Sequence, residues 1–230
     1  MLLCVCDKRL PDEAKETLSR FADLVELGIS GITYEAISGH PDIFFCKTKS
    51  IIIAAPNVPE EYLRMLDRKK VAYRLGVSPV GSAYPASAAY NAAVTESFLI
   101  HRTGITDTAI LDACSGLEKL SVQQGYTRCN LFPLKDSGFI TSDTGIYRTL
   151  LGRELNALYV KPDGILLPGF GHGFFGGACG VLGDTVFISG SLSHYPYGKQ
   201  VSEFLRSLKY DIVELYNGPL FDCGSLLFIE

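Results

Sequence analysis

Six short apolar segments recur along the chain at nearly even spacing, and this repeat limits the folds that the chain can adopt. The intervals between their first residues are 48, 47, 41, 47 and 40 residues. Repeats in this range indicate solenoids, propellers or other arrays of one structural unit. The segments are predicted β-strands that begin at Leu3, Ile51, Phe98, Phe139, Val186 and Leu226.

Between consecutive repeats, the sequence predicts a helix and then a second strand. A turn with helix-start residues follows each apolar strand, and apolar residues then recur at intervals of three or four. The predicted helices cover 10–21, 58–66, 105–117, 143–151 and 197–208. The predicted second strands cover 24–27, 71–75, 120–122, 155–160 and 211–215. A loop and one further strand then lead to the next repeat.

The last unit lacks one strand, and the first residues of the sequence can supply it. The segment 226–229 takes the place of the strand that leads into a repeat. Pairing with residues 2–6 covers two sheet edges that otherwise stay exposed. We therefore expect a five-bladed α/β-propeller, closed by pairing of the N- and C-terminal strands, with the two ends side by side.

Composition agrees with one globular unit. A chain of 230 residues with 47% hydrophobic content can bury a large core, so we expect a single domain over residues 1–230. The net charge of −4, without a basic run, argues against a nucleic-acid partner. No apolar stretch approaches the roughly 20 residues that cross a bilayer, and the first residues do not resemble a secretory signal. We expect a cytoplasmic protein, and the sequence does not decide between a monomer and a homodimer.

Asp or Asn recurs where four of the five units begin the hairpin that carries the next repeat. The residues are Asp42, Asn91, Asn130 and Asp222, which precede the following apolar strand by nine, seven, nine and four residues. Equivalent positions in a closed ring face its axis, so these side chains are expected to converge on a central cleft that binds a small molecule. The structural alternative is that Asp and Asn bond backbone amides at turns.

The segment 168–180 is rich in glycine and carries His172 at its centre. Glycine lets the backbone approach a ligand closely or adopt left-handed conformations. A phosphate site of this kind needs a helix after the loop, whereas a strand is predicted here. Phosphate binding is therefore disfavoured.

The fivefold strand-helix-strand period and the closing Asp222-Cys-Gly-Ser-Leu-Leu-Phe-Ile resemble the pentein, or guanidine-modifying enzyme, superfamily. Arginine deiminases, dimethylarginine hydrolases and amidinotransferases belong to it. The resemblance implies a five-bladed α/β-propeller with the active site on its axis, Cys223 as nucleophile and His172 as its histidine partner. Those enzymes hold a guanidinium with acidic residues in the second and third blades, where this chain has Asn91 and Asn130. Arginine-like substrates are disfavoured, because a buried guanidinium needs carboxylate partners.

The expected function is a cysteine-dependent hydrolase or transferase that acts on an amidine, amide or guanidine-like small molecule. Cys223 would form a covalent adduct, and His172 would stabilise the thiolate and move protons. Asp42 or Asp222 would orient the imidazole or bind a substrate amine, while Asn91 and Asn130 would donate neutral hydrogen bonds. No cofactor is expected.

Two other interpretations use some of the same residues. Cysteine packs as a small apolar side chain, so Cys223 can be structural, in a pentein scaffold that binds a macromolecule as translation initiation factor 6 does. The seven cysteines are an odd number, which favours free thiols over disulfides. Cys4 and Cys6 lie on one face of a predicted strand, but no second pair of metal ligands supports zinc there, so no metal is expected.

Overall fold

The computed structural model describes residues 2–135 and 138–229. Its described strands form five three-stranded sheets and one two-stranded sheet. In each three-stranded sheet, the middle strand pairs antiparallel with one neighbour and parallel with the other. In spatial order, the three-stranded sheets are β17 (Leu227–Ile229), β1 (Leu3–Asp7) and β2 (Asp23–Leu27); β3 (Phe45–Lys47), β4 (Ile52–Ala54) and β5 (Tyr73–Leu75); β6 (Ala93–Val94), β7 (Phe98–His101) and β8 (Glu118–Ser121); β9 (Leu131–Leu134), β10 (Gly138–Thr141) and β11 (Ala157–Tyr159); and β13 (Cys179–Leu182), β14 (Thr185–Ile188) and β15 (Asp211–Glu214). The two-stranded sheet pairs β12 (Ile165–Leu166) with β16 (Leu220–Phe221).

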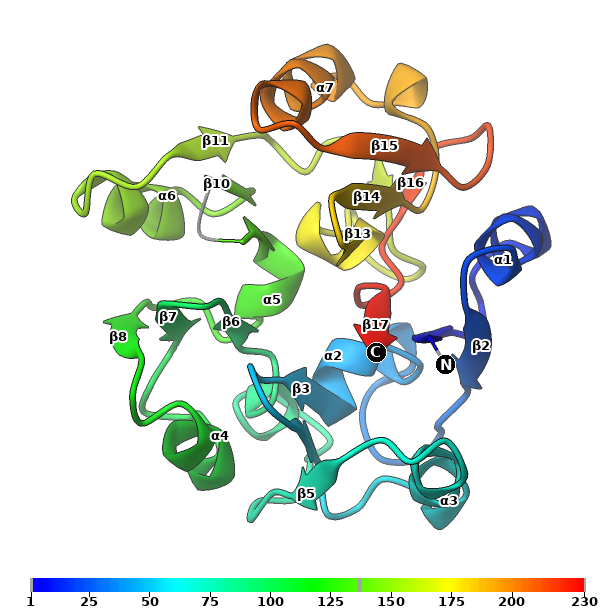
Figure 1. Ribbon diagram of the computed structural model, residues 1–230, viewed down its shortest axis with the longest axis vertical. Helices are drawn as coiled ribbons and strands as arrows, with labels where there is room; N and C mark the ends of the chain where they lie inside the picture. Colours follow the sequence, from blue (N-terminus) through cyan, green and yellow to red (C-terminus); the bar gives the residue numbers. More distant parts are fainter. Residues whose placement is uncertain (1, 136–137, 230) are drawn as a thin grey trace.

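A helix joins the two parallel strands of every three-stranded sheet. Such strands need a crossover connection, which is usually helical. The five predicted helices and the five predicted second strands are confirmed, with shifts of a few residues at their ends. Figure 1 shows these helices at the outside of the molecule. They are α1 (Asp12–Ser19), α3 (Glu60–Arg68), α4 (Thr108–Ala113), α6 (Thr144–Leu151) and α7 (Gly198–Ser207).

Short helical turns that the sequence does not predict precede the four described hairpins, and one further turn precedes the crossover helix α7. Figure 1 shows α2 and α5 nearer the centre of the molecule than the five crossover helices. Each of these turns has only three or four residues, too few to show a helical repeat of apolar residues. They are α2 (Pro41–Phe44), α5 (Thr127–Asn130), η1 (Glu35–Ile37), η2 (Ala86–Ala88), η3 (Gly176–Ala178) and η4 (Leu192–His194).

The two ends of the described chain pair with each other. β1 and β17 are antiparallel, with Leu3 opposite Ile229 and Val5 opposite Leu227. The N- and C-terminal ends lie close together in Figure 1. The predicted pairing of the terminal strands is therefore confirmed, and so is the predicted mixed α/β fold.

The hydrophobic core consists of clusters that connect neighbouring sheets. One cluster joins Cys4 of β1, Leu18 of α1, Phe187 of β14 and Phe228 of β17. The packing of Phe187 on Phe228, with ring centroids 4.9 Å apart, holds two sheets together. All seven cysteines are buried, and their thiols are free in this structure. None of the described helices has the length and apolar character to span a bilayer.

Two aspartates cap helices in different surroundings. Asp143 caps α6 by accepting a hydrogen bond from the backbone N–H of Ile146, at 2.8 Å. Asp107 caps α4 through the N–H of Ala109, at 2.9 Å. Its buried carboxylate also accepts bonds from the N–H groups of residues 77 and 78 and from the Tyr90 hydroxyl. Asp107 therefore ties the loop after β5 to the start of α4.

We expect Asp107→Ala to lower the free energy of unfolding by about 3 kcal/mol, because it removes one charged acceptor shared by four donors, of which the Ala109 N–H and the Tyr90 hydroxyl are buried. Asp143→Ala, which removes a less buried cap, is expected to cost about 1 kcal/mol. Urea denaturation at pH 7 measures both. Equal losses in the two variants would contradict the role given to Asp107.

Stability is also expected to depend on pH through His101. Its buried ring is held by Thr106 Oγ1 at 2.7 Å and by the carbonyl oxygen of Gly125 at 2.8 Å. Burial lowers the pKa of His101 from 6.5 to about 4. Between these two values the unfolded chain binds the proton and the folded chain does not, so stability falls as pH falls.

The contribution of His101 is about 1.4 kcal/mol per pH unit at most. Urea denaturation at pH 7 and pH 5 should show a smaller pH dependence for His101→Gln than for the wild type, and equal slopes would contradict this account.

Candidate functional site

A cluster of buried polar side chains lies where the short helical turns and the terminal strands meet. It contains Asp7 at the end of β1, His40 and Asp42 at the start of α2, Cys129 on α5, and Asp222 before β17. Each of these residues is at most 4% exposed. Such burial is unusual for three carboxylates, because an ionised group loses hydration free energy when it leaves water.

The local sequence explains how α2 presents two of these residues. Pro41 occupies the first position of α2, where its missing N–H costs no helical hydrogen bond. His40 precedes this proline in extended conformation, as residues before proline generally do. The backbone N–H of Asp42 donates to the carbonyl oxygen of Gly224, at 3.2 Å. This bond fixes α2 to the turn that precedes β17.

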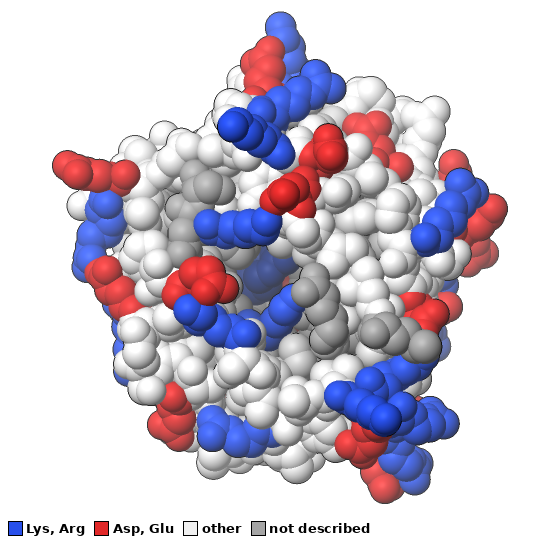
Figure 2. All heavy atoms as spheres, viewed as in Figure 1, with Lys and Arg blue, Asp and Glu red and all other residues white. Residues whose placement is uncertain are grey.

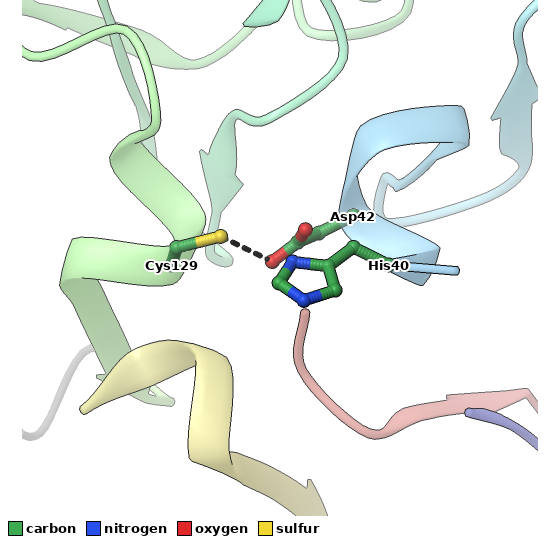
Figure 3. Close-up of side chains that lie close together, drawn as sticks. All are labelled: His40, Asp42 and Cys129. Atoms are coloured by element: carbon green, nitrogen blue, oxygen red, sulfur yellow. Dashed lines mark hydrogen bonds between the residues drawn. The ribbon is translucent and has the colours of Figure 1, made fainter. Parts of the chain in front are cut away.

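A thiol and a carboxylate from different sheets meet in this cluster. Cys129 Sγ donates a hydrogen bond to Asp42 Oδ2, at 3.0 Å (Figure 3). Asn91 supports both residues: its amide nitrogen lies 3.2 Å from the carbonyl oxygen of Asp42 and 3.3 Å from Cys129 Sγ. One ring nitrogen of His40, one carboxylate oxygen of Asp42 and Cys129 Sγ lie within 4.8 Å of one another. The thiol and the carboxylate are thus close enough for proton transfer, and the thiol, carboxylate and imidazole together lie close enough to bind one metal ion.

His40 lies between two carboxylates but is hydrogen-bonded to neither. Its Nε2 is 4.0 Å from Asp7 Oδ2, and its Nδ1 is 4.0 Å from Asp222 Oδ1. Neither nitrogen has a hydrogen-bond partner. Asp7 pairs with the Arg9 guanidinium, and Asp222 accepts bonds from the backbone N–H groups of residues 174 and 224. The two neighbouring carboxylates are therefore held in place, while the imidazole keeps both nitrogens available.

Burial changes the protonation of these groups. It raises the pKa of Asp42 to about 7 and raises the pKa of Asp222. It also raises the pKa of the Cys129 thiol, and the neighbouring Asp42 carboxylate adds to this effect. Burial lowers the pKa of His40. Each shift favours the uncharged form, as expected for ionisable groups removed from water.

Glycines allow the chain to pack closely around the cluster. A Cβ atom on Gly177 would lie 1.9 Å from Asp222 Oδ1. A Cβ atom on Gly224 would lie 2.1 Å from the Cβ of His40, and the φ of Gly224 is +66°. No other residue type fits either position without displacing a member of the cluster.

Two pockets border the cluster on different sides. One, of about 630 Å³, is lined by Arg9 and by aromatic residues that include Tyr34, Tyr126 and Phe170. Since Arg9 pairs with Asp7, this pocket reaches the cluster through a charged side chain.

The second pocket, of about 480 Å³, reaches the cluster through Asp42, which forms part of its wall. Basic residues dominate its charged lining: Lys47, Lys49, Arg128 and Lys135. Figure 2 shows a hollow bordered by Lys and Arg side chains near the middle of one face, over the region of β3, β17 and α5 in Figure 1.

The structure brings some of the predicted site residues together. Asp42, Asn91 and Asp222 belong to the cluster or contact it directly. Asn130 is buried but donates its side-chain hydrogen bond to the carbonyl oxygen of Tyr126, so it stabilises α5. The structure therefore brings three of the four predicted Asp and Asn residues near one another and leaves the side chain of Asn130 apart.

The predicted pair Cys223 and His172 is not brought together. Cys223 Sγ lies in the hydrophobic cluster with Cys4 and Cys6, 3.4 Å from the carbonyl oxygen of Gly177. His172 is exposed, and its ring contacts Phe174. No hydrogen bond joins these two described residues. The ring of His172 is exposed, whereas Cys223 is fully buried.

Sequence reasoning did not select His40, Cys129 or Asp7 for the site. Cys129 directly precedes Asn130. Counting nine residues back from the strand that begins at Phe139 therefore reaches the turn that holds Cys129 but selects Asn130 in its place. His40 precedes Pro41-Asp42 at the start of a hairpin, and this local pattern is the signal that could have found it. Asp7 ends the first apolar strand and gives no such signal.

The fold matches those of guanidine-modifying enzymes. Dimethylarginine dimethylaminohydrolase from Pseudomonas aeruginosa, a cysteine-to-serine mutant complexed with citrulline, is 8% identical, with a TM-score of 0.60 over 93% of this chain and 90% of that one. The amidinotransferase SxtG from Microseira wollei is 9% identical, with a TM-score of 0.53 over 99% and 93%. Agmatine deiminase from C. jejuni is 6% identical, with a TM-score of 0.56 over 93% and 87%. The chain therefore has the pentein fold.

At the level of sequence, the chain matches a family whose description names no activity. No curated protein matches it. Residues 5–227 match a family model, so nearly the whole chain is covered. The protein belongs to the family of unknown function DUF6873.

Proposed function

We propose that this protein is a cysteine-dependent hydrolase or transferase acting on a C–N bond of an amidine, amide or guanidine-like small molecule. Its five three-stranded sheets are the blades of a five-bladed α/β-propeller, and residues 1–230 form one domain with the site on the propeller axis. The pentein fold supports the class of substrate, because the structural neighbours include hydrolases and an amidinotransferase.

The observation that carries the proposal is the hydrogen bond from Cys129 to Asp42. A thiol becomes a strong nucleophile when a base removes its proton, and Asp42 Oδ2 is 3.0 Å from Cys129 Sγ. One ring nitrogen of His40 lies within 4.8 Å of both. The three side chains supply a nucleophile, a carboxylate that accepts its proton and an uncharged imidazole that can accept a second one, in one buried place.

The reaction follows from this arrangement. Cys129 Sγ forms a bond to the amidine carbon while its proton moves to Asp42. The C–N bond then breaks, and the leaving amine takes from Asp42 the proton that Cys129 lost. In a hydrolase, water adds to the carbon of the adduct and gives a proton to the uncharged imidazole of His40; the S–C bond then breaks, and the Cys129 thiolate regains that proton. In a transferase, an acceptor amine takes the place of water. The side-chain amide of Asn91 and the carboxylate of Asp222 are assigned to bind the nitrogen substituents of the substrate.

Asp42 connects the thiol to a route for the substrate. It is part of the wall of the 480 Å³ pocket and hydrogen-bonds to Cys129 on its other side. A pocket of this size holds a small molecule rather than a peptide segment. The substrate therefore enters through this pocket and reaches Cys129 past Asp42.

Cys223, the thiol predicted from the sequence, is the alternative nucleophile. It lies next to Asp222 and four residues before the start of β17, but its Sγ faces the core between two sheets. Burial raises the pKa of this thiol well above its ordinary value, and Asp222 adds to the shift. Catalysis by Cys223 needs its side chain to rotate toward the axis, with His40 in the role assigned to His172.

A pentein scaffold without chemistry is the second candidate function. The close packing of Gly177 and Gly224 around the cluster favours it, because little space remains next to His40 and Asp222. In that case the buried cluster is structural, and the molecule acts through its surface, as translation initiation factor 6 does.

Covalent labelling distinguishes these functions. We expect the native protein to react faster with 2-chloroacetamidine than with the neutral 2-chloroacetamide, at one thiol that mass spectrometry identifies as Cys129. The labelling is expected to disappear in Cys129→Ser and to slow at least about tenfold in Asp42→Asn, which removes the proton acceptor. Cys46→Ser is the matched control, since Cys46 is also buried and lines the same pocket.

Other labelling patterns reject the proposed nucleophile. Fast labelling that is lost only in Cys223→Ser assigns the chemistry to Cys223. Slow labelling of all thiols, equal for both reagents, rejects the enzymatic function and favours the scaffold.

A further inference from the structure

Buried polar atoms without a hydrogen-bond partner are concentrated in the buried polar cluster that contains His40 and Asp42. Among the described residues, six buried side-chain nitrogen or oxygen atoms have no hydrogen-bond partner, and three of them are Nδ1 and Nε2 of His40 and Oδ1 of Asp42. Leaving such an atom without a partner costs about 1–3 kcal/mol. An arrangement that leaves three of them in one place indicates a missing partner rather than random packing.

The charge around these atoms indicates that the missing partner is a cation. Arg9 neutralises Asp7, but no Lys or Arg nitrogen among the described residues lies within 4.0 Å of Asp42 or Asp222. Both carboxylates are at least 96% buried. Buried carboxylates in proteins are usually paired with a cation or coordinate a metal.

We propose that His40, Asp42 and Cys129 bind one zinc-like divalent metal ion. One ligand atom from each residue lies within 4.8 Å of the other two (Figure 3). Zinc binds cysteine sulfur at about 2.3 Å and histidine nitrogen or aspartate oxygen at about 2.0–2.2 Å, so its ligand atoms lie roughly 3–4 Å apart. The three side chains reach this geometry when their ligand atoms move about 1 Å closer to one another.

The ligand types select the metal. Mixed sulfur, nitrogen and oxygen donors suit zinc and related transition metals, whereas magnesium and calcium prefer oxygen ligands alone. Three protein ligands leave one tetrahedral position, which water or Asp222 can fill. The nearby carboxylate of Asp222 also compensates the charge of the ion.

The surroundings of His40 resemble the outer shell of known metal sites. A metal-bound histidine generally directs its second ring nitrogen toward a carboxylate, which fixes the ring. Nε2 of His40 faces Asp7 and Nδ1 faces Asp222, each at 4.0 Å. Whichever nitrogen binds the metal, the other therefore faces a carboxylate that is itself held by Arg9 or by backbone N–H groups.

The metal site shares Cys129 with the proposed function but does not depend on it. A thiolate bound to a metal is not free to attack a carbon atom, so the two proposals describe the protein with and without the ion. Metal binding is measured by stoichiometry and spectroscopy, which require no substrate.

The test titrates the full-length, chelator-treated protein with Co²⁺ and then displaces it with Zn²⁺. We expect one ion per chain and a sulfur-to-cobalt charge-transfer band in the near ultraviolet that Zn²⁺ removes. Cys129→Ser should lose the band, and His40→Ala should weaken binding by more than about tenfold, since even outer-shell partners are worth roughly 10- to 100-fold in affinity. His172→Ala and Cys223→Ser are controls that should bind as the wild type does.

The result that overturns the proposal is the absence of stoichiometric binding by the folded wild type, or a charge-transfer band that Cys129→Ser retains. Circular dichroism of each variant separates loss of a ligand from loss of the fold. Labelling of the metal-free protein with 2-chloroacetamidine tests the proposed function separately. A protein that binds Co²⁺ without reacting, or reacts without binding Co²⁺, supports one proposal and rejects the other.

Discussion

The antiparallel pairing of β1 with β17 brings together the parts of the molecule that form the candidate site. Leu3 lies opposite Ile229, so the first and last described strands share one sheet. This pairing places Asp7, at the end of β1, near the turn that carries Asp222 and precedes β17. His40 fits between the two carboxylates because α2 is tied to the same turn by the bond from Asp42 to Gly224. Without the pairing of the terminal strands, Asp7 and Asp222 would not be held on the two sides of His40.

Burying so many ionisable groups requires compensation from the rest of the fold. Burial pushes Asp42, Asp222, Cys129 and His40 toward their uncharged forms. The hydrophobic clusters between the sheets supply the favourable free energy that offsets this cost, through the apolar area they remove from water. Groups with such shifted pKa values occur preferentially at functional sites, and this preference distinguishes the cluster from an ordinary core.

The repeat in the sequence predicts the strands and crossover helices because both depend on the periodic burial of apolar side chains. It also predicts the pairing of the terminal strands, since the first and last strands would each leave an exposed sheet edge that the other can cover. The site is predicted less completely. Neighbouring residues in a turn point in different directions, so a count that is correct to within one residue can select the wrong side chain.

The turns of this fold give two examples of that limit. Asp222 faces His40, and Cys223, one residue later, points into the core between two sheets. On α5, Cys129 faces Asp42, while the neighbouring Asn130 bonds back to its own helical turn. Both turns are five residues or shorter and have no periodicity, so the direction of a side chain depends on tertiary contacts that the sequence does not display.

The meeting of the two terminal strands also bears on the order of the units along the chain. In each three-stranded sheet, the antiparallel pair joins the strand that ends one unit to the strand that begins the next. The antiparallel pair of β17 with β1 corresponds in this way to a hairpin such as β3 with β4. A chain opened at one of those hairpins and joined between residues 229 and 3 would contain the same strand pairs and the same buried cluster. The fold is therefore compatible with circular permutation.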